Sequence, residues 1–354
     1  MDISASLVKQ LREMTDAGMM DCKKALVEVG GDIQKAVEFL REKGLSKAAK
    51  KADRVAADGA IRLKVESDYS KAVMVEINSE TDFVAKNENF ITLGDKTLDL
   101  IAKENIKTIE SLQSAKIDSI SFDEYLKSNI AKIGENIVVR RIALLESNSK
   151  SIVNGYLHSN KRIGTIIALG FNKESSKEKL IELSNSLCMH AAAMKPQIIS
   201  FDEFDNDFIA KEKSALIAEL QKENEELKRL GKTLKTIPEF ISRKEIDSNI
   251  LEKQKEKFKE NLKAQNKPEA IWDKIIPGLV DRFIADNTLL DQRLSFLGQF
   301  FVLDDKKTIA QVLESKSKEL EDEIKIIDYI RFELGEGIEK IEEDFAKEVA
   351  NQMK

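Results

Sequence analysis

The first 45 residues carry apolar side chains at helical spacing, in three short runs that glycines separate. Leu7, Leu11 and Met14 follow one another at intervals of four and three, which places them on one face of a helix. Asp32 can cap the third helix, and Gly44 is expected to close it. The pattern predicts a small bundle of three helices.

A three-helix bundle of this kind resembles a ubiquitin-associated domain, which is commonly a docking module, although a fold alone does not fix function. We therefore predict a docking module at residues 1–45. Residues 46–58 are rich in alanine and lysine and have little apolar content. They predict a helical or flexible linker, which is either a solvated connector or a local positive patch.

Strand-like alternation begins at residue 59 and replaces the helical period. A turn at residues 67–70 separates the first two alternating runs, as in a β-hairpin. The first predicted subdomain covers residues 59–145. Its predicted strands and helices are, in chain order, strands 59–66 and 72–77, helices 87–102 and 122–133, and strand 137–145.

The same order of elements recurs further along the chain. Two strands are predicted at residues 151–158 and 163–171, a helix follows, and a last strand is predicted at 326–334. The repetition predicts an α+β fold with two related subdomains, each a small antiparallel sheet covered by helices. The second subdomain comprises residues 146–200 and 280–335.

A helical arm is predicted between the two parts of the second subdomain, at residues 201–279. This segment is dense in Lys and Glu, and apolar residues recur near heptad spacing over 209–234. A poorer seam covers 246–262, and Gly231 and Pro238 mark the tip between the two. The pattern predicts an antiparallel helical hairpin, a coiled-coil arm. It is either a bare strut or a surface for association, a homodimer included.

Composition then narrows the classes of function. The 354 residues suggest two or three domains, and 42% apolar with 34% charged residues is an ordinary soluble composition. The net charge of -6 disfavours nucleic-acid binding through bulk charge. The apolar runs are much shorter than the roughly 20 residues of a membrane-spanning helix, and the N-terminus lacks an apolar export signal. We expect a cytoplasmic protein with no membrane or nucleic-acid partner.

The sequence lacks the residue patterns of common active sites. Its two cysteines, Cys22 and Cys188, cannot form a thiolate zinc cage and are expected to be buried in a reducing compartment. A Gly-Lys-Thr triplet at residues 231–233 mimics the end of a phosphate loop, but Glu226 occupies the place of the upstream glycine. We expect no catalytic residues, no metal site and no cofactor, and hence no enzyme.

Two interpretations of residues 76–86 remain open. In one, a strand ends at Ile77, Thr81 or Asp82 caps the following helix, and Phe83 packs under the sheet. In the other, Phe83 is exposed beside the Asp82 carboxylate at a tight turn and forms a compact wedge for a partner's pocket.

Two long stretches, residues 11–26 and 76–86, match the two signatures of the bacterial elongation factor Ts family in the right order. Shorter matching phrases extend the resemblance over nearly the whole chain, at residues 56–59, 133–137 with 140–141, 156–158 with 162–164, and 331–340. The arm looks longer than usual for the family, and residues 336–354 resemble its C-terminal helical module. The chain thus resembles exchange factors of the GTPase elongation factor Tu.

The resemblance implies a site for that partner. Thr81, Asp82, Phe83 and Val84 would form the turn that enters the GTPase near its magnesium site. Phe83 would wedge between helices and Asp82 would disturb the magnesium-binding residues, so that GDP leaves and GTP can bind. His158 would push on the phosphate-loop side; without the resemblance it is a strand histidine with no role.

The resemblance also implies that Arg12, Met19 and Met20 contact a helix of the partner's nucleotide domain, and methionine suits adaptable apolar docking. On their own, the two methionines fit a loop in the core equally well. Two other functions stay open. One is an adaptor whose bundle binds some other helix. The other is an RNA-associated factor that uses Lys47–Lys51 and Arg140–Arg141, which the acidic net charge disfavours.

Overall fold

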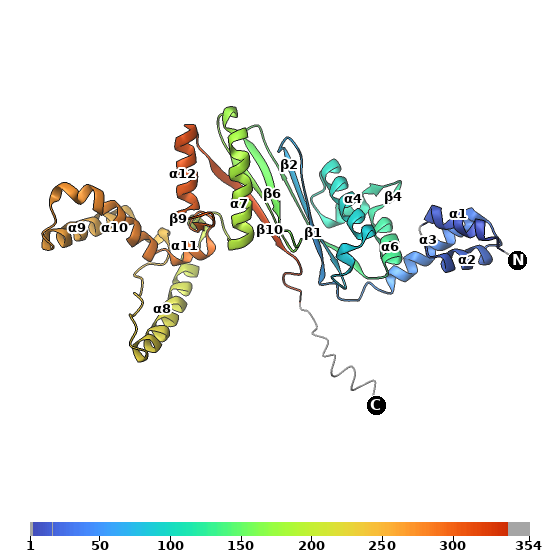
Figure 1. The fold of residues 1–354 in the computed structure, drawn as a ribbon, viewed down its shortest axis with the longest axis horizontal. Coiled ribbons are helices and arrows are strands. Elements are labelled where there is room, and N and C mark those ends of the chain that lie inside the picture. Colours follow the sequence, from blue (N-terminus) through green and yellow to red (C-terminus); the bar gives the residue numbers. More distant parts are fainter. Residues whose placement is uncertain (1–2, 16, 339–354) are drawn as a thin grey trace. The chain divides into compact units, whose positions relative to one another are not determined.

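The computed structural model describes residues 3–15 and 17–338 of the chain (Figure 1). This part combines helices with small sheets, which confirms the predicted α+β class. Contacts divide the chain into two compact units. Among the described residues, the first comprises those up to Leu169, Leu180–Cys188 and Tyr329–Ile338, and the second comprises Gly170–Lys179 and Met189–Asp328. The subdomain boundaries drawn from the sequence stay predictions.

The predicted N-terminal bundle is present. Its helices are α1 (Ala5–Thr15), α2 (Met19–Glu28) and α3 (Ile33–Ala49). Leu11, Cys22 and Leu26 are fully buried between them. The Asp32 carboxylate caps α3 as expected, because it accepts a hydrogen bond from the backbone N–H of Lys35 at 3.1 Å.

The third helix is longer than predicted. It does not close at Gly44 but continues to Ala49, and so takes up the start of the predicted linker. A Cβ atom at Gly44 would lie 3.4 Å from the Cβ of Ala131 on α6 (Phe122–Ile133). The glycine therefore marks a close approach of two helices, and this tertiary contact overrides its weak helix propensity.

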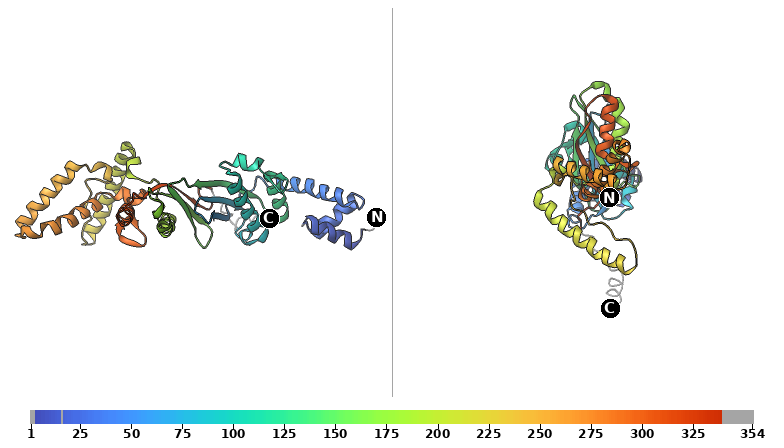
Figure 2. Two further views of the ribbon diagram at one scale, coloured as in Figure 1. Left: turned by 90° about the horizontal axis from the view of Figure 1, so that it is seen from above. Right: turned by 90° about the vertical axis from the view of Figure 1, so that its left-hand side faces the viewer.

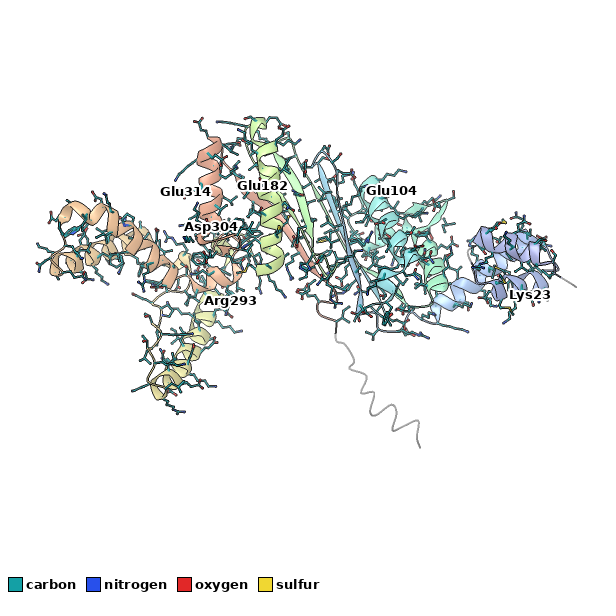
Figure 3. The ribbon with its side chains drawn as sticks, viewed as in Figure 1. Lys23, Glu104, Glu182, Arg293, Asp304 and Glu314 are labelled. Carbon is teal, nitrogen blue, oxygen red and sulfur yellow. The ribbon has the colours of Figure 1, made fainter. Side chains whose placement is uncertain are left out.

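The first sheet has three antiparallel strands in the order β1-β2-β5. These strands are β1 (Asp58–Val65), β2 (Lys71–Ser79) and β5 (Ile137–Glu146). Between β2 and β5 the chain forms helices and a small ribbon, α4 (Glu88–Glu104), α5 (Ile109–Ser114), β3 (Lys116–Ile117), β4 (Ile120–Ser121) and α6. Figure 3 labels Glu104, where α4 ends. The helices pack on one face of the sheet.

The second sheet repeats this order, as the sequence predicted. Its strands are β6 (Ser151–Leu157), β7 (Ile163–Gly170) and β10 (Lys325–Glu333), with β7 in the middle. In both sheets a hairpin comes first, and a third strand, from later in the chain, joins the second strand of that hairpin.

The first unit has apolar cores on both faces of β2. Val73, Val75 and Ile77 pack toward the helices, whereas Met74 packs toward the second sheet. A Cβ atom at Gly164 of β7 would lie 2.7 Å from the sulfur of Met74. The two sheets can therefore approach this closely only because this position has no side chain.

The carboxylate of Glu76 is fully buried at the end of this core. Arg140 Nη1 donates to its two oxygens at 3.1 and 3.2 Å, and Arg141 Nε donates to it as well. The backbone N–H of Gly335, just after β10, donates to the same carboxylate at 2.8 Å. The Arg141 guanidinium also lies 4.2 Å from the ring centroid of Phe332. One carboxylate thus links β2, β5 and the chain that follows β10.

In the second unit, the segment predicted as the helical arm, residues 201–279, contains α8 (Asn206–Arg229), α9 (Ser248–Ala264) and the first part of α10 (Trp272–Asp286). The elements that follow it are α11 (Leu289–Leu294), β8 (Phe300–Phe301), β9 (Asp304–Thr308) and α12 (Ile309–Leu320). Figure 3 labels Arg293 on α11, Asp304 on β9 and Glu314 on α12.

The pairing inside the arm differs from the prediction. We expected α8 to pair with the helix that follows, but α9 packs against α10, and α8 diverges from both (Figures 1 and 2). After Gly231, which has a φ of +65°, the chain returns along α8 without helix, and Asn224 is hydrogen-bonded to the Lys235 backbone at 2.7 and 2.8 Å. This polar contact occupies the flank of α8 that the leucine seam assigned to a second helix.

The second unit also buries a histidine, His190 on α7 (Ile181–Met194). Its Nδ1 accepts from the backbone N–H of Val302 at 3.3 Å, so the protonated Nε2 donates to Gln299 Oε1 at 3.0 Å. Burial lowers the pKa of His190 from 6.5 to about 4, and the hydrogen bond to Gln299 offsets part of this shift. The ring is therefore neutral at pH 7.

The sequence also predicted that no helix spans a membrane and that the chain ends in a helical module. In the part that the structure describes, no helix has both the length and the apolar character needed to cross a membrane. The predicted C-terminal helical module, residues 336–354, lies outside the described residues from position 339 onward.

Replacing Glu76 by Gln keeps the size of the side chain and removes its charge. Arg140 and Arg141, whose side chains are 29% and 27% exposed, then lose their shared counter-charge but still reach some water. We expect the free energy of unfolding to fall by about 3 kcal/mol, measured by urea denaturation. Glu66→Gln, in an exposed pair with Lys64, is the control and should cost under about 1 kcal/mol. Equal stability of the Glu76 variant and wild type would contradict this role.

The second unit should lose stability in mild acid through His190. Its folded-state pKa lies below the unfolded value of 6.5, so its contribution is present above pH 6.5 and is lost as the pH falls toward 4. Between pH 7 and pH 5 the free energy of unfolding should fall by about 2 kcal/mol through this residue. Unfolding of wild type and His190→Gln at both pH values measures it, with His158→Gln as the exposed control. A pH dependence that is the same in His190→Gln would refute the assignment.

Candidate functional site

The turn after β2 is the first part of the candidate site. Strand β2 ends at Ser79, and the short 3-10 helix η1 (Val84–Lys86) precedes α4. The cap of α4 is Asn87, whose side chain accepts from the backbone N–H of Asn89 at 2.9 Å. The expectation that Thr81 or Asp82 caps this helix was therefore wrong, and both residues belong to the turn itself.

Phe83 is the most exposed large apolar residue that the structure describes, at 79%. Asp82 beside it is also exposed, whereas Val84 is buried in the core against the helices. The interpretation that Phe83 packs under the sheet was wrong, and the exposed aromatic at a tight turn is confirmed. An aromatic ring left in water gains nothing for the fold, and it suits a buried contact with a partner.

The base of this turn is held by carboxylates. Both the backbone N–H and the hydroxyl of Thr81 donate to Glu135, at 2.9 and 2.6 Å. The backbone N–H of Asn136 donates to Glu80 at 2.6 Å, and the Ser79 hydroxyl donates to the carbonyl of Thr81 at 2.8 Å. No sequence pattern singled out Glu135 or Glu80, although they lie within the family-like stretches 133–137 and 76–86. The turn is thus an ordered projection.

His158 lies in the turn between β6 and β7 and is exposed. Its backbone N–H donates to Ile163 at 2.9 Å, and its ring stands edge-on to Tyr156 with 6.4 Å between centroids. Within the same turn, the carbonyl of Lys161 accepts from the N–H of Ile61 on β1 at 2.8 Å.

The two turns share one end of the paired sheets. Arg162, next to the His158 turn, forms an ion pair of 3.2 Å with Asp58 at the start of β1. Asp58 is the register partner of Ser79, the last residue of β2 before the Thr81–Val84 turn. The structure therefore brings Asp82, Phe83 and His158 to the same end of the first unit.

The bundle carries a separate exposed surface. Arg12 is exposed on α1, and Met19 and Met20 are 57% and 65% exposed at the start of α2, so they do not form a core loop. Met14, which the helical spacing assigned to the core face, is 52% exposed instead. Lys23, labelled in Figure 3, marks the exposed side of α2.

Among the residues that the structure describes, no group of three or more His, Cys, Asp or Glu side chains is placed to hold a metal ion. Cys22 and Cys188 are free thiols and both are buried, as expected. Burial raises the pKa of the Cys188 thiol far above its ordinary value, which keeps it protonated.

Comparisons with known proteins agree on one family. The family model described as "Elongation factor TS" matches residues 80–236 and 233–336. Proteins named elongation factor Ts from Wolinella succinogenes and Helicobacter hepaticus are each 65% identical over 352 residues, which is 99% of this chain and 99% of theirs. One from Helicobacter pylori is 62% identical over the same length.

The matched regions include the turn after β2 and the chain after β10, and the full-length relatives also include the N-terminal bundle. The resemblance inferred from the two signatures is thereby confirmed. The chain belongs to the elongation factor Ts family of translation elongation factors.

Proposed function

We propose that this protein is a guanine-nucleotide exchange factor that binds elongation factor Tu in its GDP state, displaces the magnesium ion and promotes GDP release, so that GTP can bind. The observation that carries the proposal is the exposed Phe83 beside Asp82, on a turn whose base is hydrogen-bonded to Glu135. Membership of the elongation factor Ts family supports the same partner.

The turn acts as a wedge. The Phe83 ring enters between two helices of the GTPase and exchanges water for apolar contacts. The Asp82 carboxylate reaches the residues that hold magnesium and disturbs their arrangement, so that they hold the ion less well. Magnesium neutralises phosphate charge, so its loss weakens the hold on GDP. Thr81 and Val84 anchor the two ends of the wedge, one through hydrogen bonds and the other through the core.

His158 supplies a second push at the phosphate-loop side of the partner. It is exposed at the same end of the sheets as Phe83, so one approach of the GTPase engages both turns. Two separate contacts matter because each tenfold weakening of nucleotide affinity needs about 1.4 kcal/mol of coupling.

The bundle docks on a helix of the partner's nucleotide domain through Arg12, Met19 and Met20. Exposed methionines adapt their shape to a partner surface, and the arginine supplies a charged rim contact. In this scheme the bundle contributes affinity and the two turns contribute exchange.

The remaining features of the proposal follow from this scheme. The protein breaks no covalent bond, needs no catalytic residue or cofactor, and acts in the cytoplasm. A homodimer through the helical arm belongs to the proposal, because every residue of α10 is half-buried or exposed in the part of the chain that the structure describes. A nucleic-acid partner does not, because Arg140 and Arg141 are bound to Glu76 and Lys47 to Asp21.

A second candidate function is a plain adaptor that binds through the bundle alone. The separate exposed surface of Arg12, Met19 and Met20 is the observation in its favour. An adaptor would bind a partner without speeding nucleotide release.

Release of a fluorescent GDP analogue from elongation factor Tu, followed by stopped flow, tests the wedge. We expect wild type to accelerate release strongly, and Phe83→Ala, Asp82→Ala and His158→Ala each to slow the maximal rate by about tenfold or more. Val55→Ala, which shortens another exposed apolar side chain of the first unit, is the control. Full acceleration by all three variants would sink the mechanism, and no acceleration by wild type with intact binding would favour the adaptor.

The bundle is tested by the double variant Met19→Ala/Met20→Ala. Loss of two apolar contacts should raise the concentration for half-maximal exchange about tenfold, with an unchanged maximal rate, because docking is equal in the ground and transition states. Titration of the variant against a fixed amount of GDP-loaded partner measures both quantities. Val27→Ala, exposed on the same helix, is the matched control. A fall in the maximal rate alone would contradict the docking role.

A further inference from the structure

The ladder of hydrogen bonds between β2 and β5 ends two residues before Thr81, the first residue of the wedge. Its last pair is Ser79 with Ile137. Continued by one and two residues, the same register would place Glu80 opposite Asn136 and Thr81 opposite Glu135.

Side-chain carboxylates take the place of backbone carbonyls at these two positions. The backbone N–H of Asn136 donates to the Glu80 carboxylate at 2.6 Å, and that of Thr81 donates to the Glu135 carboxylate at 2.9 Å. Each strand end therefore offers a carboxylate to the backbone amide of the other. The sheet is extended by side chains while its two backbones begin to separate.

Both carboxylate oxygens of Glu135 accept hydrogen bonds from Thr81. One carboxylate oxygen accepts the backbone N–H and the other accepts the hydroxyl, at 2.6 Å. Hydrogen bonds to an ionised acceptor are stronger than those between neutral groups. Glu135 directly follows Gly134, whose φ of +91° ends α6, so the position of the carboxylate is set by a helix end and a strand start.

The Glu80 carboxylate is held from a second side. Arg54 Nη1 lies 3.4 Å from it, and the Asn136 side chain donates to the carbonyl of Arg54 at 2.8 Å. Asn136 is 3% exposed, so this part of the brace is shielded from water. Glu80 thus fixes the strand end, and Glu135 fixes the first residue of the wedge.

We propose that Glu135 is a positioning residue for nucleotide exchange. It fixes Thr81, so that Asp82 and Phe83 leave the sheet in the one direction that enters the partner, while Val84 anchors the other end in the core. This inference rests on the proposed function, because it assigns Glu135 a role that is exerted through Phe83. Without the carboxylate the turn samples other directions, and fewer encounters carry the ring into its pocket.

The experiment places Glu135→Ala in two backgrounds, wild type and Phe83→Ala, and measures the maximal rate of fluorescent GDP release from elongation factor Tu. We expect a fall of about tenfold in the wild-type background and of less than about twofold when Phe83 is absent. Glu135→Gln keeps one carbonyl acceptor, so its maximal rate should lie between those of wild type and Glu135→Ala. The concentration for half-maximal exchange should change less than the rate.

Two further variants separate positioning from folding. Thr81→Val removes the hydroxyl that Glu135 accepts, and its effect should not add to that of Glu135→Ala. Glu146→Ala, at the opposite end of β5 in pairs with Lys71 and Lys107, is the matched control and should exchange like wild type. Thermal unfolding of each variant shows that the compared proteins are folded.

The outcomes are distinct. A normal rate for Glu135→Ala, with Phe83→Ala slow, overturns the positioning role and leaves the proposed function standing. An equal fall in both backgrounds also overturns it, because Glu135 then acts independently of Phe83. A normal rate for Phe83→Ala overturns the wedge itself, and with it the role of Glu135.

Discussion

The buried carboxylate of Glu76 connects parts of the fold that the chain makes far apart. Burial of an unpaired charge is costly, and here two guanidinium groups and one backbone amide offset that cost. Successive residues of a regular strand point to opposite faces of the sheet. The register shift opposite Glu76 makes Arg140 the extra residue of β5, so that both arginines can reach one carboxylate. The ion cluster therefore depends on a local irregularity in the first sheet.

The candidate site depends on this arrangement. Strand β2 carries Glu76 three residues before its last residue, Ser79. The wedge therefore projects from a strand that is packed against apolar cores on both faces and held by the Glu76 ion cluster near its end. The His158 turn joins the same end through the contacts of Ile61 and Asp58. An exposed phenylalanine is useful only if its direction is defined, and here the surrounding packing defines it.

The sequence predicted most of the elements and fewer of their contacts. Helix α6 and the strands of both sheets follow from apolar periodicity, because that signal is local. The end of α3 and the pairing of α9 were mispredicted. Gly44 approaches Ala131 on another helix, and α8 is hydrogen-bonded to Lys235 in the chain that follows it, and no local pattern shows these contacts. In the site, the pattern left Phe83 undecided between core and surface. Glu135 was missed because it is 54 residues from Thr81 in the sequence, and only the register of β2 and β5 brings the two residues together.

The insertion of the arm between β7 and β10 has a consequence for synthesis of the chain. The first sheet can close once β5 has left the ribosome, but the second must wait for β10, and the Gly335–Glu76 hydrogen bond spans 259 residues. During that interval the edge of β7 stays unpaired and the Glu76 cluster lacks one donor. Pairings of such high contact order form slowly and leave an edge open to wrong partners. The nascent chain therefore completes the first sheet early and its ion cluster among the last events of folding.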